Sequence, residues 1–218
     1  MGVLFLLVLL PAVVDWIAVR RNDLRLERVA KPATLAVLIV ATAVAWSGDF
    51  DQRFVATMVA LVLSLAGDVF LMGQRDRFVP GLIAFFGAHV AYIVAFGGAV
   101  LSPYSVFLGT TLVLVGGPLF LAIRQGLRRK GKSELIFPVL AYVFVISLMV
   151  LTALTSPGAN EWTRSSIIAA AVGALLFYCS DALIGLHRFV RELPWAPVTI
   201  MVTYHLGQIG LAYSLARA

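Results

Sequence analysis

Residues 54–73 read FVATMVALVLSLAGDVFLMG, an apolar run in which Asp68 is the only charged side chain. About 20 apolar residues in a helix cross the hydrocarbon core of a bilayer. A carboxyl group inside such a helix costs roughly 2.5–3.5 kcal/mol on insertion scales, so it marks a functional position by default. The stretch FYCSDALIG at residues 177–185 places Asp181 in the same way. The sequence therefore predicts membrane helices that carry two carboxyl groups.

The composition supports a membrane protein. The chain is 61% hydrophobic and 13% charged, which a soluble domain of 218 residues could not bury in one core. The single cysteine, Cys179, excludes an internal disulfide and a CxxC motif. The net charge of +6 comes from basic residues in short connections between apolar runs, so we expect no nucleic-acid partner. The amino terminus lacks the basic start and cleavage site of a signal peptide, which predicts a retained first span.

Eight apolar runs are long enough to cross a membrane. They cover residues 3–19, 32–48, 54–73, 80–100, 105–123, 135–154, 165–186 and 195–215. They lack the polar alternation of a barrel wall, so we predict an all-α membrane protein with eight transmembrane helices. The connections are short, which predicts one integral membrane domain over residues 1–218. Pro32, Pro80 and Pro197 are expected in first turns, where a missing N–H group costs little.

The distribution of Lys and Arg predicts the orientation. Of the 17 basic residues, all but Arg53, Arg164 and Arg217 lie in the first, third, fifth and seventh connections. Cytoplasmic loops carry the excess of Lys and Arg, so these basic connections are expected in the cytoplasm and both termini outside a cell membrane.

A weak internal repeat in the sequence suggests two parallel four-helix halves. The third and seventh runs end in SLAGDVFL and FYCSDALIG, and each is followed by a basic turn and a helix that carries His and Tyr. These side chains are His89 and Tyr92 in the first pair, and Tyr204 and His205 in the second. Sites in such repeats tend to form between the halves, so both aspartates are expected to face one cavity.

Polar side chains share helix faces with these groups. Ser64 lies four residues before Asp68, and Gln208 lies one turn after Tyr204. Isolated polar groups can serve as hydrogen-bonding contacts between helices, but two Asp and two His at similar depths favour a functional cavity. By contrast, Asp15 and Trp16 are expected as anchors at the interface or as ion-pair partners of Lys31, and Tyr142 and Tyr178 in packing.

The motifs resemble one known family. SLAGDVFLM, GLIAFFGAHVAYIVAF and GALLFYCSDALIG, with KPATL at the start of the second run, are similar to the YhhN-like lysoplasmalogenases. The resemblance covers nearly the whole chain and includes eight spans. It implies hydrolysis of the vinyl ether of a lysoplasmalogen, which releases a fatty aldehyde and a glycerophospho-base. The implied partners are a lysophospholipid substrate and membrane lipid, and no cofactor or metal is implied.

The chemistry can be assigned to residues. A vinyl ether breaks when its β-carbon is protonated, and water captures the resulting cation. This needs a proton donor and a nearby counter-charge, which two carboxyl groups can supply. Asp68, His89 and Asp181 are therefore the predicted catalytic residues. Lys31 is expected to meet the phosphate at the membrane rim, and the remaining substrate-binding candidates are Ser64, Tyr92, Tyr204, His205 and Gln208.

Two other classes of protein use the same residue types. A proton-coupled transporter of a small or lipidic solute would also carry buried Asp and His in two helical halves. A metallohydrolase could hold zinc with two His and two Asp, but the sequence has no HExxH pair on one helix, which ranks it third.

The predicted orientation can be tested by cysteine labelling after removal of Cys179. A cysteine at Arg25 or Gly131 should be protected from an impermeant reagent added outside the cell. A cysteine at Asp51 or Ala159 should be labelled, because the basic connections face the cytoplasm. The opposite pattern would place both aspartates near the outer leaflet.

Overall fold

A computed structural model describes residues 2–72, 77–159 and 162–217, and every regular element in this part of the chain is helical. Gly73, the predicted end of the third span, and Arg75, counted among the basic loop residues, lie outside it. Seven helical stretches in the described residues are long and apolar enough to cross a membrane. The protein is therefore a multi-pass α-helical membrane protein.

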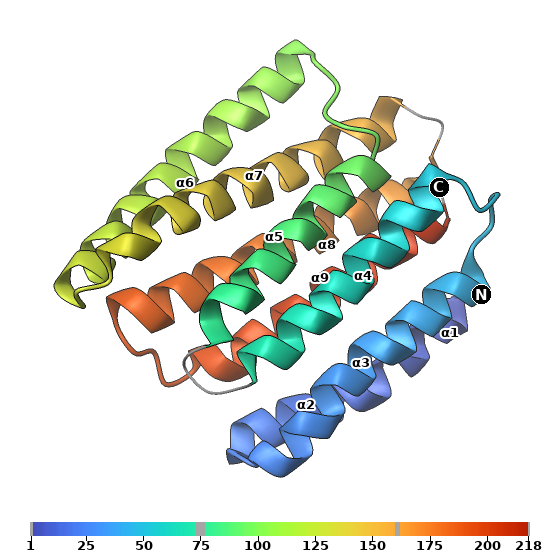
Figure 1. Cartoon of the computed structure of the whole chain (residues 1–218). Helices are drawn as coiled ribbons and strands as arrows, with labels where there is room; N and C mark the ends of the chain where they lie inside the picture. Colours follow the sequence, from blue (N-terminus) through green and yellow to red (C-terminus); the bar gives the residue numbers. More distant parts are fainter. Residues whose placement is uncertain (1, 73–76, 160–161, 218) are drawn as a thin grey trace.

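The helices form a bundle of long antiparallel rods joined by short turns (Figure 1). Their bounds are α1 Gly2–Leu7, α2 Leu9–Arg21, α3 Leu24–Ala45, α4 Gln52–Leu71, α5 Phe78–Ala95, α6 Pro103–Arg129, η2 Ser133–Leu135, α7 Ile136–Ala159, α8 Arg164–Gly185, η3 Leu186–Val190 and α9 Ala196–Ala216. The turns from α2 to α3, α6 to α7 and α8 to α9 lie at one end, and both chain ends lie at the other (Figure 1). The described basic connections therefore gather at one end, which we call the basic end.

The second helix begins earlier than predicted. The sequence predicts a span over residues 32–48, whereas α3 covers Leu24–Ala45. Asp23 caps its first turn by accepting hydrogen bonds from the backbone N–H groups of Arg25 and Leu26. The prediction that Pro32 lies in a first turn was wrong, because this cap starts the helix two turns before the proline. Lys31 is consequently buried on the helix rather than placed in a loop.

Helix α9 covers the predicted span 195–215 but is not one of the seven apolar stretches. It packs against α8, α2, α3 and α4, and more than half of its residues are buried. A helix covered by protein can carry polar side chains that a lipid-facing helix cannot, so its hydropathy is low. The predicted count of eight membrane spans is therefore not confirmed, and neither is the division into two halves.

The most extensive helix contact joins α8 and α9, and glycines bring the two backbones together. A Cβ atom added to Gly173 would lie 2.7 Å from the backbone nitrogen of Leu211, and one added to Gly207 would lie 2.8 Å from that of Phe177. Gly210 is equally tight, since its Cβ would lie 2.9 Å from the carbonyl oxygen of Ala169. Small residues let the two backbones touch, as in other close membrane helix pairs. This contact fixes the position of Asp181 relative to Tyr204.

We expect Gly207→Ala to destabilise the protein by about 1–3 kcal/mol, because the added methyl group would force α9 away from α8. Gly117→Ala is the matched control, since no atom lies within 4 Å of a Cβ at that helical glycine. Thermal unfolding in detergent should show a lower midpoint for Gly207→Ala only. Equal midpoints for the two variants would show that the α8–α9 contact tolerates separation.

Candidate functional site

A cavity of about 140 Å³ lies inside the bundle near the basic end. Its polar lining comes from five elements: Lys31 of α3, Asp68 of α4, Ser180 and Asp181 of α8, Arg188 of η3 and Tyr204 of α9. The structure therefore brings the two aspartates to one cavity, although more than a hundred residues separate them in the sequence.

Asp68 is almost fully buried and has two partners. The Tyr204 hydroxyl donates to its Oδ2 at 2.7 Å, and the Lys31 ammonium lies 3.8 Å from its Oδ1. Lys31 is itself only 6% exposed, so its ammonium would stabilise the carboxylate that Asp68 becomes when it loses a proton. The sequence places Lys31 at the membrane rim, whereas the structure places it beside the carboxyl group.

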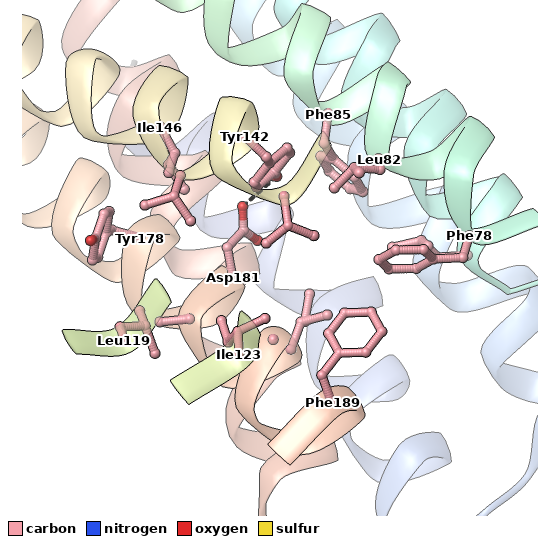
Figure 2. Close-up of a pocket in the computed structure, with 16 residues that line it drawn as sticks. Phe78, Leu82, Phe85, Leu119, Ile123, Tyr142, Ile146, Tyr178, Asp181 and Phe189 are labelled. Atoms are coloured by element: carbon pink, nitrogen blue, oxygen red, sulfur yellow. Dashed lines mark hydrogen bonds between the residues drawn. The ribbon is translucent and has the colours of Figure 1, made fainter. Parts of the chain in front are cut away.

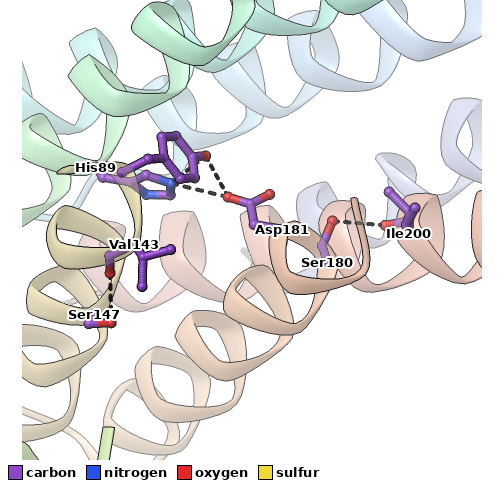
Figure 3. A network of polar contacts seen from close by, with 7 residues as sticks. His89, Val143, Ser147, Ser180, Asp181 and Ile200 are labelled. Atoms are coloured by element: carbon purple, nitrogen blue, oxygen red, sulfur yellow. Dashed lines mark hydrogen bonds and ion pairs between the residues drawn. The ribbon is translucent and has the colours of Figure 1, made fainter. Parts of the chain in front are cut away.

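Asp181 belongs to a second cluster (Figure 3). The Tyr142 hydroxyl donates to its Oδ2 at 2.5 Å, and the His89 Nε2 lies 3.3 Å from the same oxygen and 3.0 Å from the Tyr142 oxygen. Since Tyr142 gives its one proton to Asp181, its oxygen accepts from His89, which places a proton on Nε2. The other ring nitrogen, Nδ1, has no hydrogen-bond partner in the described residues.

An apolar cavity of about 70 Å³ adjoins this cluster (Figure 2). Phe78, Leu82, Leu119, Ile123 and Phe189 form part of its wall, and Asp181 is the only charged group that lines it in the described residues. The two cavities share five lining residues, namely Leu71, Phe78, Phe85, Asp181 and Ile184. Asp181 therefore lies at the junction between polar and apolar space.

Gly67 explains why an aromatic ring can reach this junction. A Cβ atom at Gly67 would lie 2.6 Å from Cε2 of Phe85, so the ring packs directly on the helix beside Asp68. Phe85 also makes an edge contact with Tyr204 at 5.8 Å between centroids. The Gly–Asp pair thus combines a carboxyl group with the space for the ring that borders both cavities.

Four of the predicted substrate-binding residues line neither cavity. Tyr92 donates to the Gln208 side-chain oxygen at 2.5 Å in the core between α5 and α9. Ser64 is fully buried, and its hydroxyl has no hydrogen-bond partner in the described residues. His205 accepts a hydrogen bond from the Trp16 indole at 3.1 Å, on the side of α9 that faces α2.

Two residues that the sequence assigned elsewhere belong near the site. Tyr142, expected in packing, contacts both His89 and Asp181. Asp15, expected at the interface, is fully buried, and neither of its carboxyl oxygens has a hydrogen-bond partner in the described residues. No local motif identifies Tyr142, because its partners come from α5 and α8. Within the same described residues, no group of three or more His, Cys, Asp and Glu could hold a metal ion.

These observations define a class of protein. It is a multi-pass helical membrane protein in which two carboxyl groups line a buried cavity beside apolar space, and each carboxyl group accepts a hydrogen bond from a tyrosine. The chain belongs to the YhhN family, whose sequence profile matches residues 26–215.

Curated relatives cover most of the chain. This chain is 33% identical over 172 residues to "Lysoplasmalogenase TMEM86B" from Homo sapiens, and the aligned segment covers 79% of this chain and 67% of the relative. It is 33% identical over 165 residues to "Lysoplasmalogenase TMEM86A" from Bos taurus, covering 73% and 65%. It is 33% identical over 183 residues to "Lysoplasmalogenase" from Mycobacterium tuberculosis, covering 81% and 66%. The chain thus spans about two thirds of the length of these relatives. No solved structure matched it.

Proposed function

We propose that this protein is a membrane hydrolase that cleaves the vinyl ether bond of a lysoplasmalogen to a fatty aldehyde and a glycerophospho-base. The observation that carries the proposal is the placement of Asp68 and Asp181 in one buried cavity that adjoins apolar space. The relatives with lysoplasmalogenase names support the same reaction. They do not favour the alternative of a proton-coupled transporter.

The first step is proton transfer to carbon. Asp68 donates a proton to the β-carbon of the vinyl ether, and the π electrons form the new C–H bond. The α-carbon becomes an oxocarbenium ion, and Asp181 provides the counter-charge. The Tyr204 hydroxyl on Oδ2 of Asp68 leaves Oδ1, which has no hydrogen bond in the described residues, to carry the proton.

The second step adds water. Asp181 takes a proton from a water molecule while the oxygen of that water forms a bond to the α-carbon. The product of this step is a hemiacetal. His89 lies behind Asp181 and Tyr142 and lines neither cavity, so it orients the carboxyl group. Asp68, now a carboxylate, then takes the proton of the hemiacetal hydroxyl, the C–O bond to glycerol breaks, and Asp181 gives its proton to the glycerol oxygen. Both carboxyl groups thereby return to their starting states. One water molecule is consumed in total.

The cavities offer apolar and polar space on the two sides of the scissile bond. We place the first carbons of the alkenyl chain in the apolar cavity, so that the vinyl ether meets Asp181 at the junction and the polar head extends toward the basic end. With α9 as an eighth crossing, both termini lie outside the cell and the basic end faces the cytoplasm. Lys31 and Tyr204 form part of the polar side of the site.

Product analysis tests the reaction. Purified protein incubated with a lysoplasmalogen in D₂O should release an aldehyde with one deuterium on the carbon next to the carbonyl, because that carbon is the one protonated. Mass spectrometry of the trapped aldehyde measures this label, and authentic aldehyde kept in D₂O controls for exchange. An acyl lysophospholipid should give no product. Fatty acid from that lipid without aldehyde from the vinyl ether would indicate a lysophospholipase instead.

Replacement of the proton donor tests the mechanism. Asp68→Asn keeps the size of the side chain but removes the transferable proton, so we expect kcat to fall by about 10²–10⁴-fold. The fold should persist, because an amide is less costly to bury than a carboxyl group. Asp23→Asn is a control at an exposed helix cap, where the amide preserves capping. A folded Asp68→Asn protein that kept most of its aldehyde production would show that Asp68 is structural.

A further inference from the structure

A third cavity, of about 490 Å³, lies at the basic end, between the α6–α7 connection and the segment that joins α8 to α9. We call it the vestibule. Its charged and polar lining consists of Lys130, Lys132, His187, Arg188 and Glu192. The other three lining residues are Ile184, Phe189 and Ile200. From the sequence alone, the basic residues of this region predict only the orientation of the protein in the membrane.

The vestibule adjoins the candidate site. Ile184, Arg188 and Ile200 line both the vestibule and the polar cavity that contains Asp68 and Asp181. Arg188 lies at this boundary, with its guanidinium carbon 4.3 Å from the centre of the Phe78 ring. Phe78 in turn lines both the polar and the apolar cavity. A lipid could therefore extend from apolar space, past the carboxyl groups, to the vestibule.

The donors of the vestibule are held in place by the fold. The Lys130 ammonium donates to the carbonyl oxygen of Arg188 at 2.7 Å, which joins the two connections. The backbone N–H of Leu193 donates to Nδ1 of His187 at 2.9 Å, so the proton of the neutral ring lies on Nε2. Gly126 permits this approach, because a Cβ there would lie 2.1 Å from the carbonyl oxygen of Phe189. The π-helix η3 thus places His187 and Arg188 in the lining of the vestibule.

We propose that the vestibule binds the head group of the lipid, an inference that rests on the function proposed above. Arg188, Lys132 and the Nε2–H of His187 bind the phosphate, since guanidinium and ammonium groups are the usual partners of phosphate. This assigns the phosphate to the η3 end of the bundle rather than to Lys31, which is buried with Asp68. The scissile bond then lies between the bound phosphate and the alkenyl chain.

The chemistry also selects the class of head group. Glu192 is the one acidic side chain among the described residues that line the vestibule. A carboxylate beside several cations matches a zwitterion, in which a phosphate is followed by an amine. We therefore assign Glu192 as the residue that contacts the amine of the head group.

Binding of an uncleavable lipid tests the assignment separately from catalysis. The probes are a saturated 1-O-alkyl lysophosphoethanolamine, the matching 1-O-alkylglycerol and inorganic phosphate, each titrated into the detergent-solubilised protein. We expect Arg188→Gln to raise the Kd of the alkyl lysophospholipid about tenfold and Lys132→Gln about threefold. The Kd of the alkylglycerol should not change, because it lacks the phosphate. Arg129→Gln removes an exposed charge at the same end without lining the vestibule, and should have no effect.

The outcomes separate this inference from the proposed reaction, because none of the probes has a vinyl ether. Variants that bind the alkyl lysophospholipid as the unchanged protein does would overturn the vestibule assignment even if aldehyde is formed. Arg188→Gln could weaken binding of both the alkyl lysophospholipid and the alkylglycerol, because Arg188 packs on Phe78. In that case the effect of Lys132→Gln on the two lipids decides whether the vestibule binds the phosphate. Inorganic phosphate that binds more tightly than the lipid would indicate a free-phosphate site instead. Glu192→Gln should weaken binding of the ethanolamine lipid but not of the alkyl glycerophosphate that lacks the amine.

Discussion

The contact between α8 and α9 is the constraint on which the site depends. Three glycines let the backbones of these two helices touch. Because Asp181 lies on α8 and Tyr204 on α9, this contact sets the position of one residue relative to the other. Tyr204 in turn holds Asp68 of α4. In a membrane, helices associate through close packing and hydrogen bonds rather than through the hydrophobic effect. A small-residue contact at the centre of the bundle therefore determines which polar groups can meet.

The two carboxyl groups have different partners although they share a cavity. Asp68 has a tyrosine and an ammonium group, whereas Asp181 has a tyrosine and an imidazole. Unequal surroundings allow two like residues to take different roles, as in enzymes that use a carboxyl pair as acid and base. The packing of the bundle thus brings the two groups into one cavity, and the neighbouring helices make them chemically distinct.

Much of the candidate site could be predicted from the sequence, because a charged group in an apolar helix is conspicuous. Asp68, Asp181, Lys31 and Tyr204 line one cavity, and His89 contacts Asp181. Tyr142 could not be predicted, because tyrosine is common in packing and its partners lie on other helices. His205 looked equivalent to His89 in the sequence, but it faces α2 and binds Trp16. Equivalent sequence positions have different neighbours when the surrounding helices differ.

The sequence by itself determined the class of protein, since the length and apolarity of the runs leave helices across a bilayer as the solution. It also identified the carboxyl groups, because their burial cost is evident without coordinates. Only the tertiary structure decided that α3 begins at Leu24 and that Lys31 pairs with Asp68. It alone showed that Tyr142 donates a hydrogen bond to Asp181 and that the three cavities adjoin through shared lining residues. The physical reason is that hydropathy reports a preference for lipid or water, whereas a partner is chosen by helix packing between residues far apart in the chain.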